Sequence, residues 1–281
     1  MLQPDPSPNW LELFPDRDFQ FTLGLKPGDP RSFFKPGPHH ATWKQQRRQE
    51  LRDRPDQCIL YRSDAAAMVK ETLELAEAWT PFTHKDQQHL NASSELASRL
   101  AVLGILWEPD YLLLAPDGDG TFILKAGVIC FPSSWSPESK LGLNVHHIHA
   151  PVPTLNSELG TRIDSFLLRM RPATSWLRAN WGISASANLN QHPSMQLSPV
   201  NRQLPASDIW IRIEHQFFYK LPNSGGILFG IRLQNLSVAE ITMSSEASRG
   251  LLRAIVTMPN AIAHYKNILP VREHLLHLLA P

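Results

Sequence analysis

The chain has 281 residues, and its 27 basic and 26 acidic side chains leave a formal net charge of +1. The length suits one large domain or two modest ones, and the balanced charge argues against a nucleic-acid-binding protein or a polybasic membrane anchor, which need clustered basic residues. The chain shows no basic segment followed by an apolar one, so we expect no secretory signal, and it has no apolar run of about 18 residues, so we expect no membrane span. Its two cysteines, Cys58 and Cys130, are too few for a disulfide framework. We therefore expect a cytoplasmic location.

Residues 1–55 are rich in proline and form a predicted irregular segment ahead of the main domain, which we place at residues 56–281. Disordered tails rarely carry many aromatic residues, so we expect this segment to wrap around the core. Its phenylalanines are Phe14, Phe19, Phe21, Phe33 and Phe34. The charged run Arg47–Arg54 is interpreted as a solvated surface.

Beyond residue 55 the hydrophobic pattern has first the spacing of helices and then that of strands. The predicted helices cover residues 64–79, 94–105 and 156–170, and then 245–257, 259–267 and 271–279. The predicted strands cover residues 111–115, 121–131, 209–219 and 227–233, and the turn residues between them indicate two antiparallel hairpins. Residues 184–205 are polar and irregular, as in a surface loop or lid. This order predicts an α+β fold with one antiparallel sheet and flanking helices.

Several motifs that bind nucleotides or support hydrolysis are missing from the sequence. There is no Gly-x-Gly-x-x-Gly after a strand, no Walker-type phosphate loop, no Gly-x-Ser-x-Gly elbow and no His-Glu-x-x-His helix. The sequence therefore gives no sign that the chain binds a dinucleotide by itself. If the protein carries out redox chemistry, we expect the electrons to come from another protein.

Three histidines lie within four residues, at His146, His147 and His149. In an extended segment His147 and His149 would share one face, with His146 opposite, so at most two of them could bind one metal ion locally. A histidine that is hydrogen-bonded in the core or exposed is the commoner case. Cys130 ends an apolar strand, and we interpret it as an inert buried cysteine.

The region around these histidines resembles the signature block of the heme-dependent oxidative N-demethylase-like family. The matching residues are Cys130–Trp135 (CFPSSW), Lys140–Gly142 (KLG) and Ile148–Pro153 (IHAPVP). Further matches in the same order are Glu108–Leu114 (EPDYLLL), Arg178–Trp181 (RANW), Ile211–Gln216 (IRIEHQ), Leu221–Pro222 (LP) and Phe229–Arg232 (FGIR). The resemblance spans about residues 20–270.

The resemblance implies a PAS-like, heme-binding fold, in agreement with the predicted antiparallel sheet. Members of the family use heme b and molecular oxygen, with electrons from a separate flavin reductase, to demethylate a small secondary amine and release formaldehyde. A flavin reductase that uses NADPH is therefore the implied partner, either as a separate protein or as a subunit of a hetero-oligomer.

The shared blocks also imply roles for single residues. His149 is the first choice for the axial ligand of heme iron, because a neutral imidazole is the usual donor, and His147 is the second. The heme propionates need cationic partners. The candidates are Lys140, Arg178 and Arg212, each of which could instead form a structural ion pair.

Trp135 and Trp181 are candidates for the walls of an apolar heme pocket, although plain core packing is an equal alternative for each. Glu214 is the candidate catalytic residue, and strand alternation puts it on the same face as Arg212. A buried carboxylate needs a partner. Glu214 either pairs with Arg212 for structural reasons, or attracts a substrate ammonium group and relays protons to bound oxygen.

Three functions are compatible with these residues. The first is an oxygen-dependent heme enzyme that acts on a small amine, the second a PAS-like heme or ligand sensor without turnover, and the third a structural subunit that has lost heme. A sensor normally carries an output domain or a coiled-coil linker, and the closing helices are too short for sustained heptads. The sequence therefore favours the enzyme.

Overall fold

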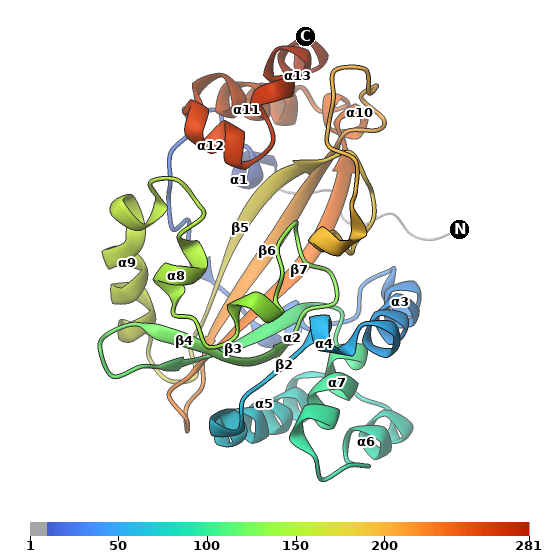
Figure 1. Cartoon of the computed structure of the whole chain (residues 1–281), viewed down its shortest axis with the longest axis vertical. Helices are drawn as coiled ribbons and strands as arrows, with labels where there is room; N and C mark the ends of the chain where they lie inside the picture. The colour runs from blue at the N-terminus through green and yellow to red at the C-terminus, as the bar shows by residue number, and fades with distance from the viewer. Residues whose placement is uncertain (1–9, 281) are drawn as a thin grey trace.

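A single antiparallel sheet organises residues 10–280, the part of the chain that this computed structural model describes. Its seven strands follow the order β1-β5-β6-β7-β3-β4-β2. The long strands β5, β6 and β7 run up the molecule, and β3 and β4 cross at their lower end (Figure 1). The strands are β1 (Lys26–Pro27), β2 (Ile59–Tyr61), β3 (Asp110–Pro116), β4 (Phe122–Val128), β5 (Ser175–Ser184), β6 (Trp210–Lys220) and β7 (Ile227–Ser237). This confirms the predicted α+β fold with an antiparallel, PAS-like sheet.

Both predicted hairpins are present, and local chemistry explains their turns. Between β3 and β4 the Asp117 carboxylate accepts hydrogen bonds from the backbone N–H groups of Asp119 (2.9 Å) and Thr121 (3.1 Å). Between β6 and β7 the turn is fastened to the helix that contains Glu71, whose carboxylate accepts from the N–H groups of Asn223 (2.7 Å) and Ser224 (2.8 Å). Each turn thus satisfies backbone donors that the sheet cannot.

Helices gather at the two ends of the sheet and along β5 (Figure 1). In chain order, the helices before β3 are α1 (Trp10–Leu13), α2 (Pro30–Phe33), α3 (His40–Asp53), α4 (Pro55–Cys58), α5 (Ala66–Trp79), α6 (His84–Leu90) and α7 (Leu96–Leu106). Those after β4 are α8 (Val145–His149), α9 (Leu155–Arg169), α10 (Val238–Thr242), α11 (Ser245–Thr257), α12 (Asn260–Tyr265) and α13 (Arg272–Leu279). The predicted helices after residue 55 are therefore confirmed, with ends that differ by a few residues. No helix within residues 10–280 has the length and hydropathy needed to cross a membrane.

Two separate hydrophobic cores fill the molecule, and strand β6 contributes to both. Its residues Ile211 and Ile213 belong to the core shared with α10, α11 and α13, whereas Phe217 and Tyr219 belong to the core shared with α5, α7, β3 and β4. All four side chains occupy alternate positions of the strand, so they share one face. The opposite face of β6 carries the polar residues described below.

The predicted wrapping of the N-terminal segment is confirmed within the described residues; residues 1–9 lie outside them. Phe34 stacks on Trp107 in the first core, with ring centroids 3.9 Å apart. Phe14 is buried in the second core, where its backbone lies so close to α11 that a Cβ atom on Gly250 would be 1.8 Å from the Phe14 carbonyl oxygen. The N-terminal segment thus contributes buried aromatic side chains to both cores.

Two details of the N-terminal prediction are wrong. Residues 40–53 form the regular helix α3, not an irregular stretch. Arg47 is only 1% exposed and pairs with Asp110 at 2.8 Å, so the run Arg47–Arg54 is not uniformly a solvated surface. The reason is tertiary, because Asp110 starts strand β3 more than sixty residues later and needs a cation when it is buried.

Candidate functional site

The polar face of strands β5 and β6 carries most of the residues that the sequence singled out. In the sheet register Arg178 lies opposite Gln216, Asn180 opposite Glu214 and Gly182 opposite Arg212. Directly opposed residues of antiparallel strands point to the same side. The structure therefore brings the predicted residues Arg178, Arg212 and Glu214 together on one face.

His149 reaches this face from helix α8, and its local structure differs from the prediction. Residues 145–149 are helical because the Asn144 side chain caps the backbone N–H of His147 at 2.9 Å. In a helix the positions i and i+3 are neighbours, so His149 shares a face with His146 rather than with His147. His147 is exposed, and the expected pairing of His147 with His149 is wrong.

His146 fastens helix α8 to α9, since its Nε2 lies 2.7 Å from Asp164 Oδ2. His149 is left without such a partner: its Nδ1 is buried and has no hydrogen bond within the described chain. The pKa of His149 is lowered to about 4, chiefly by burial, with the nearby Arg178 and His146 acting in the same direction. A neutral imidazole with an unbonded nitrogen is the form that a metal ligand requires.

Among the charged groups, Arg178 has the largest effect on the pKa of His149. Within residues 10–280, no oppositely charged side chain contacts Arg178 directly. Burial lowers the pKa of its guanidinium, and the Glu214 carboxylate only partly opposes this effect. Its Nε is buried without a hydrogen-bond partner, and no ion pair to Arg178 occurs among residues 10–280. A buried guanidinium without an anion is costly, so this position is suited to an anionic ligand group.

Glu214 has partners, but Arg212 is not directly one of them. The Ser133 hydroxyl donates to Glu214 Oε1 at 2.6 Å and accepts from Arg212 Nε at 2.7 Å, so it stands between the two charges. Gln216 Nε2 donates to the other carboxylate oxygen at 2.9 Å. The predicted direct pairing of Glu214 with Arg212 is thus replaced by a hydroxyl-bridged one, which holds Glu214 in a fixed orientation.

Arg212 anchors two loops over the sheet. Its Nη2 donates to the carbonyl oxygens of Phe131 and Leu189, both at 2.7 Å. Burial lowers the pKa of Arg212 to about 10. The guanidinium thus holds the signature block and the polar segment 184–205 against the sheet through Ser133 and loop carbonyls, the structural alternative given for Arg212 above in a different form.

Lys266 directly follows helix α12, and its side chain contacts strand β5. Its Nζ donates to Asn180 Oδ1 at 3.3 Å and to the Trp181 carbonyl oxygen, and it lies 5.2 Å from the centroid of the Trp181 ring. Burial lowers the pKa of Lys266 to about 8, with Arg178 contributing in the same direction and Glu214 opposing it. Lys266 therefore adds a second desolvated cation beside Arg178.

The remaining predicted residues lie elsewhere. Trp181 points to the opposite face of β5 from Arg178 and packs edge-on against Phe14, with centroids 5.8 Å apart, so it does not wall a pocket with Arg178. Trp135 is partly buried against the first core. Lys140 ends a short 3-10 turn (Glu138–Lys140), and none of the contacts described for it ties it to His149 or Arg178. Cys130 is buried, and burial raises the pKa of its thiol, as expected for an inert cysteine.

Three residues of the site were missed by the sequence analysis. Asn180 and Ser133 belong to the family motifs given above. Because residues two positions apart on a strand share a face, the position of Arg178 could have predicted that Asn180 also lies at the site. Lys266 had no such signal, because it comes from a helix far along the chain and meets β5 only through tertiary packing.

The donor set fits a heme better than a metal ion bound by side chains alone. Within residues 10–280 no group of three or more His, Cys, Asp or Glu side chains could hold a metal ion. Heme iron needs only one axial donor from the protein, and the propionates need cations. The unbonded Nδ1 of His149 and the unpaired guanidinium of Arg178 are compatible with both needs.

A comparison with known protein families agrees with this geometry. Residues 24–276 match the family described as "Haem-dependent oxidative N-demethylase, alpha subunit-like". The match covers the whole sheet, most of both cores and every residue of the site described above. The chain therefore belongs to the heme-dependent oxidative N-demethylase alpha subunit-like family.

Proposed function

We propose that this chain is the heme-binding, oxygen-using subunit of an oxidative N-demethylase that acts on a small amine, with electrons from a separate flavin reductase that oxidises NADPH. The observation that carries the proposal is the group of His149, Arg178 and Glu214 on one polar sheet face, where an imidazole nitrogen and a guanidinium have no protein partner. Family membership supplies the reaction class.

Each residue would have a separate task. His149 would bind the iron of heme b, and Arg178 would pair with a propionate, assisted by the charge of Lys266. Heme, when bound, supplies the oxygen-activating redox chemistry. Glu214 would hold the ammonium group of the substrate, because its carboxylate is kept in place by Ser133 and Gln216 and accepts no direct bond from Arg212.

The overall reaction requires an electron donor. Removal of a methyl group as formaldehyde places one oxygen atom in the product and the other in water, with two electrons and two protons supplied. The absence of a dinucleotide motif in the sequence and the words "alpha subunit-like" in the family description support a donor on another chain. NADPH oxidation should therefore need an added reductase.

Replacing His149 tests the cofactor assignment. We expect His149→Ala to lose stoichiometric heme or to change the ferric absorption spectrum, because the iron loses its axial donor. The matched control is His147→Ala, which removes an exposed imidazole from the same helix and should keep both heme content and Soret position. Unaltered heme and spectrum in folded His149→Ala would place the ligand elsewhere.

Replacing Glu214 tests the amine assignment. The amide of Glu214→Gln still accepts a hydrogen bond from Ser133, so we expect the melting temperature to change little. Loss of one charged hydrogen bond should weaken amine-induced spectral shifts, or turnover with the reductase, about tenfold. A large drop in melting temperature with unchanged amine affinity would instead make Glu214 a purely structural residue.

A further inference from the structure

A groove lies between helix α9, strand β5 and the N-terminal segment. Its volume is about 670 Å³, within the range of roughly 300–1,000 Å³ that is usual for small-molecule pockets. It is lined by Leu23, Thr161, Arg162, Ser165, Phe166, Arg169, Met170, Arg171, Thr174 and Trp176. This groove contains none of His149, Arg178 or Glu214, although Trp176 lies two residues before Arg178 on β5.

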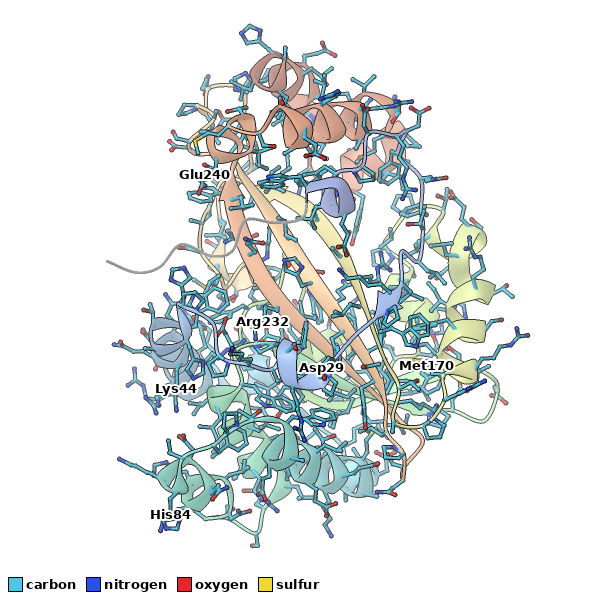
Figure 2. The ribbon with its side chains drawn as sticks, turned by 180° about the vertical axis from the view of Figure 1, so that it is seen from behind. Asp29, Lys44, His84, Met170, Arg232 and Glu240 are labelled. Carbon is cyan, nitrogen blue, oxygen red and sulfur yellow. The ribbon has the colours of Figure 1, made fainter. Side chains whose placement is uncertain are left out.

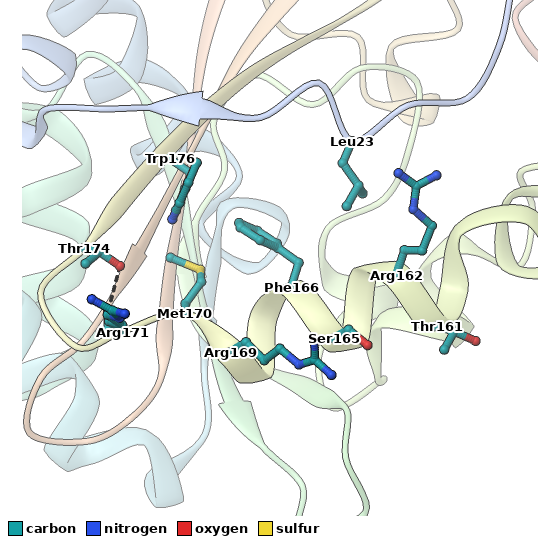
Figure 3. Close-up of a pocket in the computed structure, with 10 residues that line it drawn as sticks. All are labelled: Leu23, Thr161, Arg162, Ser165, Phe166, Arg169, Met170, Arg171, Thr174 and Trp176. Carbon is teal, nitrogen blue, oxygen red and sulfur yellow. Dashed lines mark hydrogen bonds between the residues drawn. The ribbon is translucent and has the colours of Figure 1, made fainter.

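The interior of the groove is apolar. Figure 3 shows Leu23, Phe166, Met170 and Trp176 turned toward one another from the three elements that form it. The Phe166 ring meets Trp176 edge-on, with centroids 6.1 Å apart, and Phe218 supports Phe166 from behind at 5.6 Å. Aromatic walls held in this way give a firm surface for an apolar body.

The rim of the groove is positive. Arg162, Arg169 and Arg171 are all exposed, and within residues 10–280 no ion pair engages any of them. None of the ten lining residues is acidic. The two acids of α9 are bonded elsewhere, Glu158 to the Thr154 hydroxyl at 2.6 Å and Asp164 to His146 at 2.7 Å. In a chain whose net charge is +1, three uncompensated arginines around one apolar cavity form a distinct local field.

We propose that this groove binds an amphipathic anion, a small molecule with an apolar body and a carboxylate or phosphate head group. The apolar body would fill the space between Phe166, Met170 and Trp176, and the head group would meet the arginines of the rim. Guanidinium groups match both carboxylates and phosphates through paired N–H donors. A neutral ligand would leave the charges of the rim unused, and a cation would be repelled by them.

Calorimetric titration of the heme-loaded protein tests this site. Decanoate and decyl phosphate should each bind with one-to-one stoichiometry, and their relative affinities distinguish a carboxylate from a phosphate site. Decan-1-ol, which has the same apolar body without charge, should bind at least tenfold more weakly. Equal affinity for the acid and the alcohol, or no binding of either anion, would overturn the proposal.

Variants locate the binding in this groove. Each exposed arginine–anion contact is worth up to about fivefold in affinity, so Arg169→Gln should weaken decanoate binding by about that factor. The triple variant Arg162→Gln, Arg169→Gln, Arg171→Gln should no longer distinguish decanoate from decan-1-ol. The matched control is Arg249→Gln, which changes an exposed arginine on α11 outside the groove and should leave binding unchanged.

A spectral measurement keeps this proposal separate from the heme assignment. The triple variant should retain its heme content and Soret position, and His149→Ala should still bind decanoate. If the triple variant loses heme, the arginines belong to the heme pocket and a separate site is ruled out.

Discussion

Two regions of the molecule bury charged side chains, and they satisfy them very differently. Around Asp110 the opposite charges meet directly: Arg47 pairs with it at 2.8 Å, and the N–H groups of Cys130 and Phe131 donate to its oxygens at 2.8 and 3.0 Å, although Arg47 Nε keeps no hydrogen bond. Around Arg178 no ion pair forms within residues 10–280, and the Arg178 Nε and the His149 Nδ1 are both buried without hydrogen-bond partners.

This difference in charge compensation indicates separate roles for the Asp110 and Arg178 regions. The Asp110 cluster ties α3, β3 and the start of the signature block together, and its opposite charges pair within the protein. The Arg178 region retains a desolvated guanidinium whose cost the Glu214 carboxylate compensates only in part. Figure 2 shows the side chains of the described residues from behind the view of Figure 1. We infer that the first region serves folding and the second serves a ligand.

The largest expected effect is on the complete cluster. Arg47→Met removes the cation and leaves the buried Asp110 carboxylate unpaired, which should lower the free energy of unfolding by about 3–5 kcal/mol. Urea denaturation of the purified protein measures this. The matched control on the same helix is Arg52→Gln, whose side chain is 75% exposed and should matter by less than about 0.5 kcal/mol. A similar loss in both variants would contradict the special role of the cluster.

The opposite result is expected for Arg178. In heme-free protein Arg178→Gln should leave the free energy of unfolding unchanged or raise it by up to about 1 kcal/mol, because a desolvated charge without an ion-pair partner disappears. The same variant should bind heme about tenfold more weakly, since one charge-assisted hydrogen bond is lost. Heme titration and urea denaturation of one preparation give both numbers. Destabilisation comparable to that of Arg47→Met would mean that Arg178 also serves folding.

The last expected effect is confined to alkaline pH and concerns Lys266. Its pKa is lowered from 10.5 to about 8, so between these values the unfolded chain holds a proton that the folded protein has lost. Stability must therefore rise with pH across this window, by at most about 3 kcal/mol from this group. The Lys266→Gln variant removes the contribution. The difference between the two proteins in free energy of unfolding, measured as a function of pH, gives the contribution of Lys266. If the two curves ran parallel, the lowered pKa of Lys266 would be contradicted.

The strand region shows how far periodicity alone can predict the site. Alternation along residues 209–219 places Ile211 and Ile213 on one face and Arg212 and Glu214 on the other, as the structure confirms. The same rule, applied to Arg178 and Trp181, separates them onto opposite faces of β5. The sequence analysis did not apply it there and so grouped both around one pocket.

The histidine segment shows where local pattern fails. The sequence analysis treated residues 146–149 as an extended part of a loop, and the conformation of this segment decides which two histidines are neighbours. The cap from Asn144 and the pairing of His146 with Asp164 of α9 make the segment helical. This leaves His149 directed at β5 and exposes His147.

Sequence by itself thus determined the antiparallel sheet, the positions of its hairpins and main helices, and the family of the chain, because these depend on periodicity, turn chemistry and motif order. Only the tertiary structure decided which charges are satisfied. Arg47 with Asp110, Ser133 between Arg212 and Glu214, and Lys266 beside Asn180 are contacts between residues distant in sequence. Whether a buried charge is compensated depends on the groups that packing brings within hydrogen-bond distance, and no local pattern encodes that.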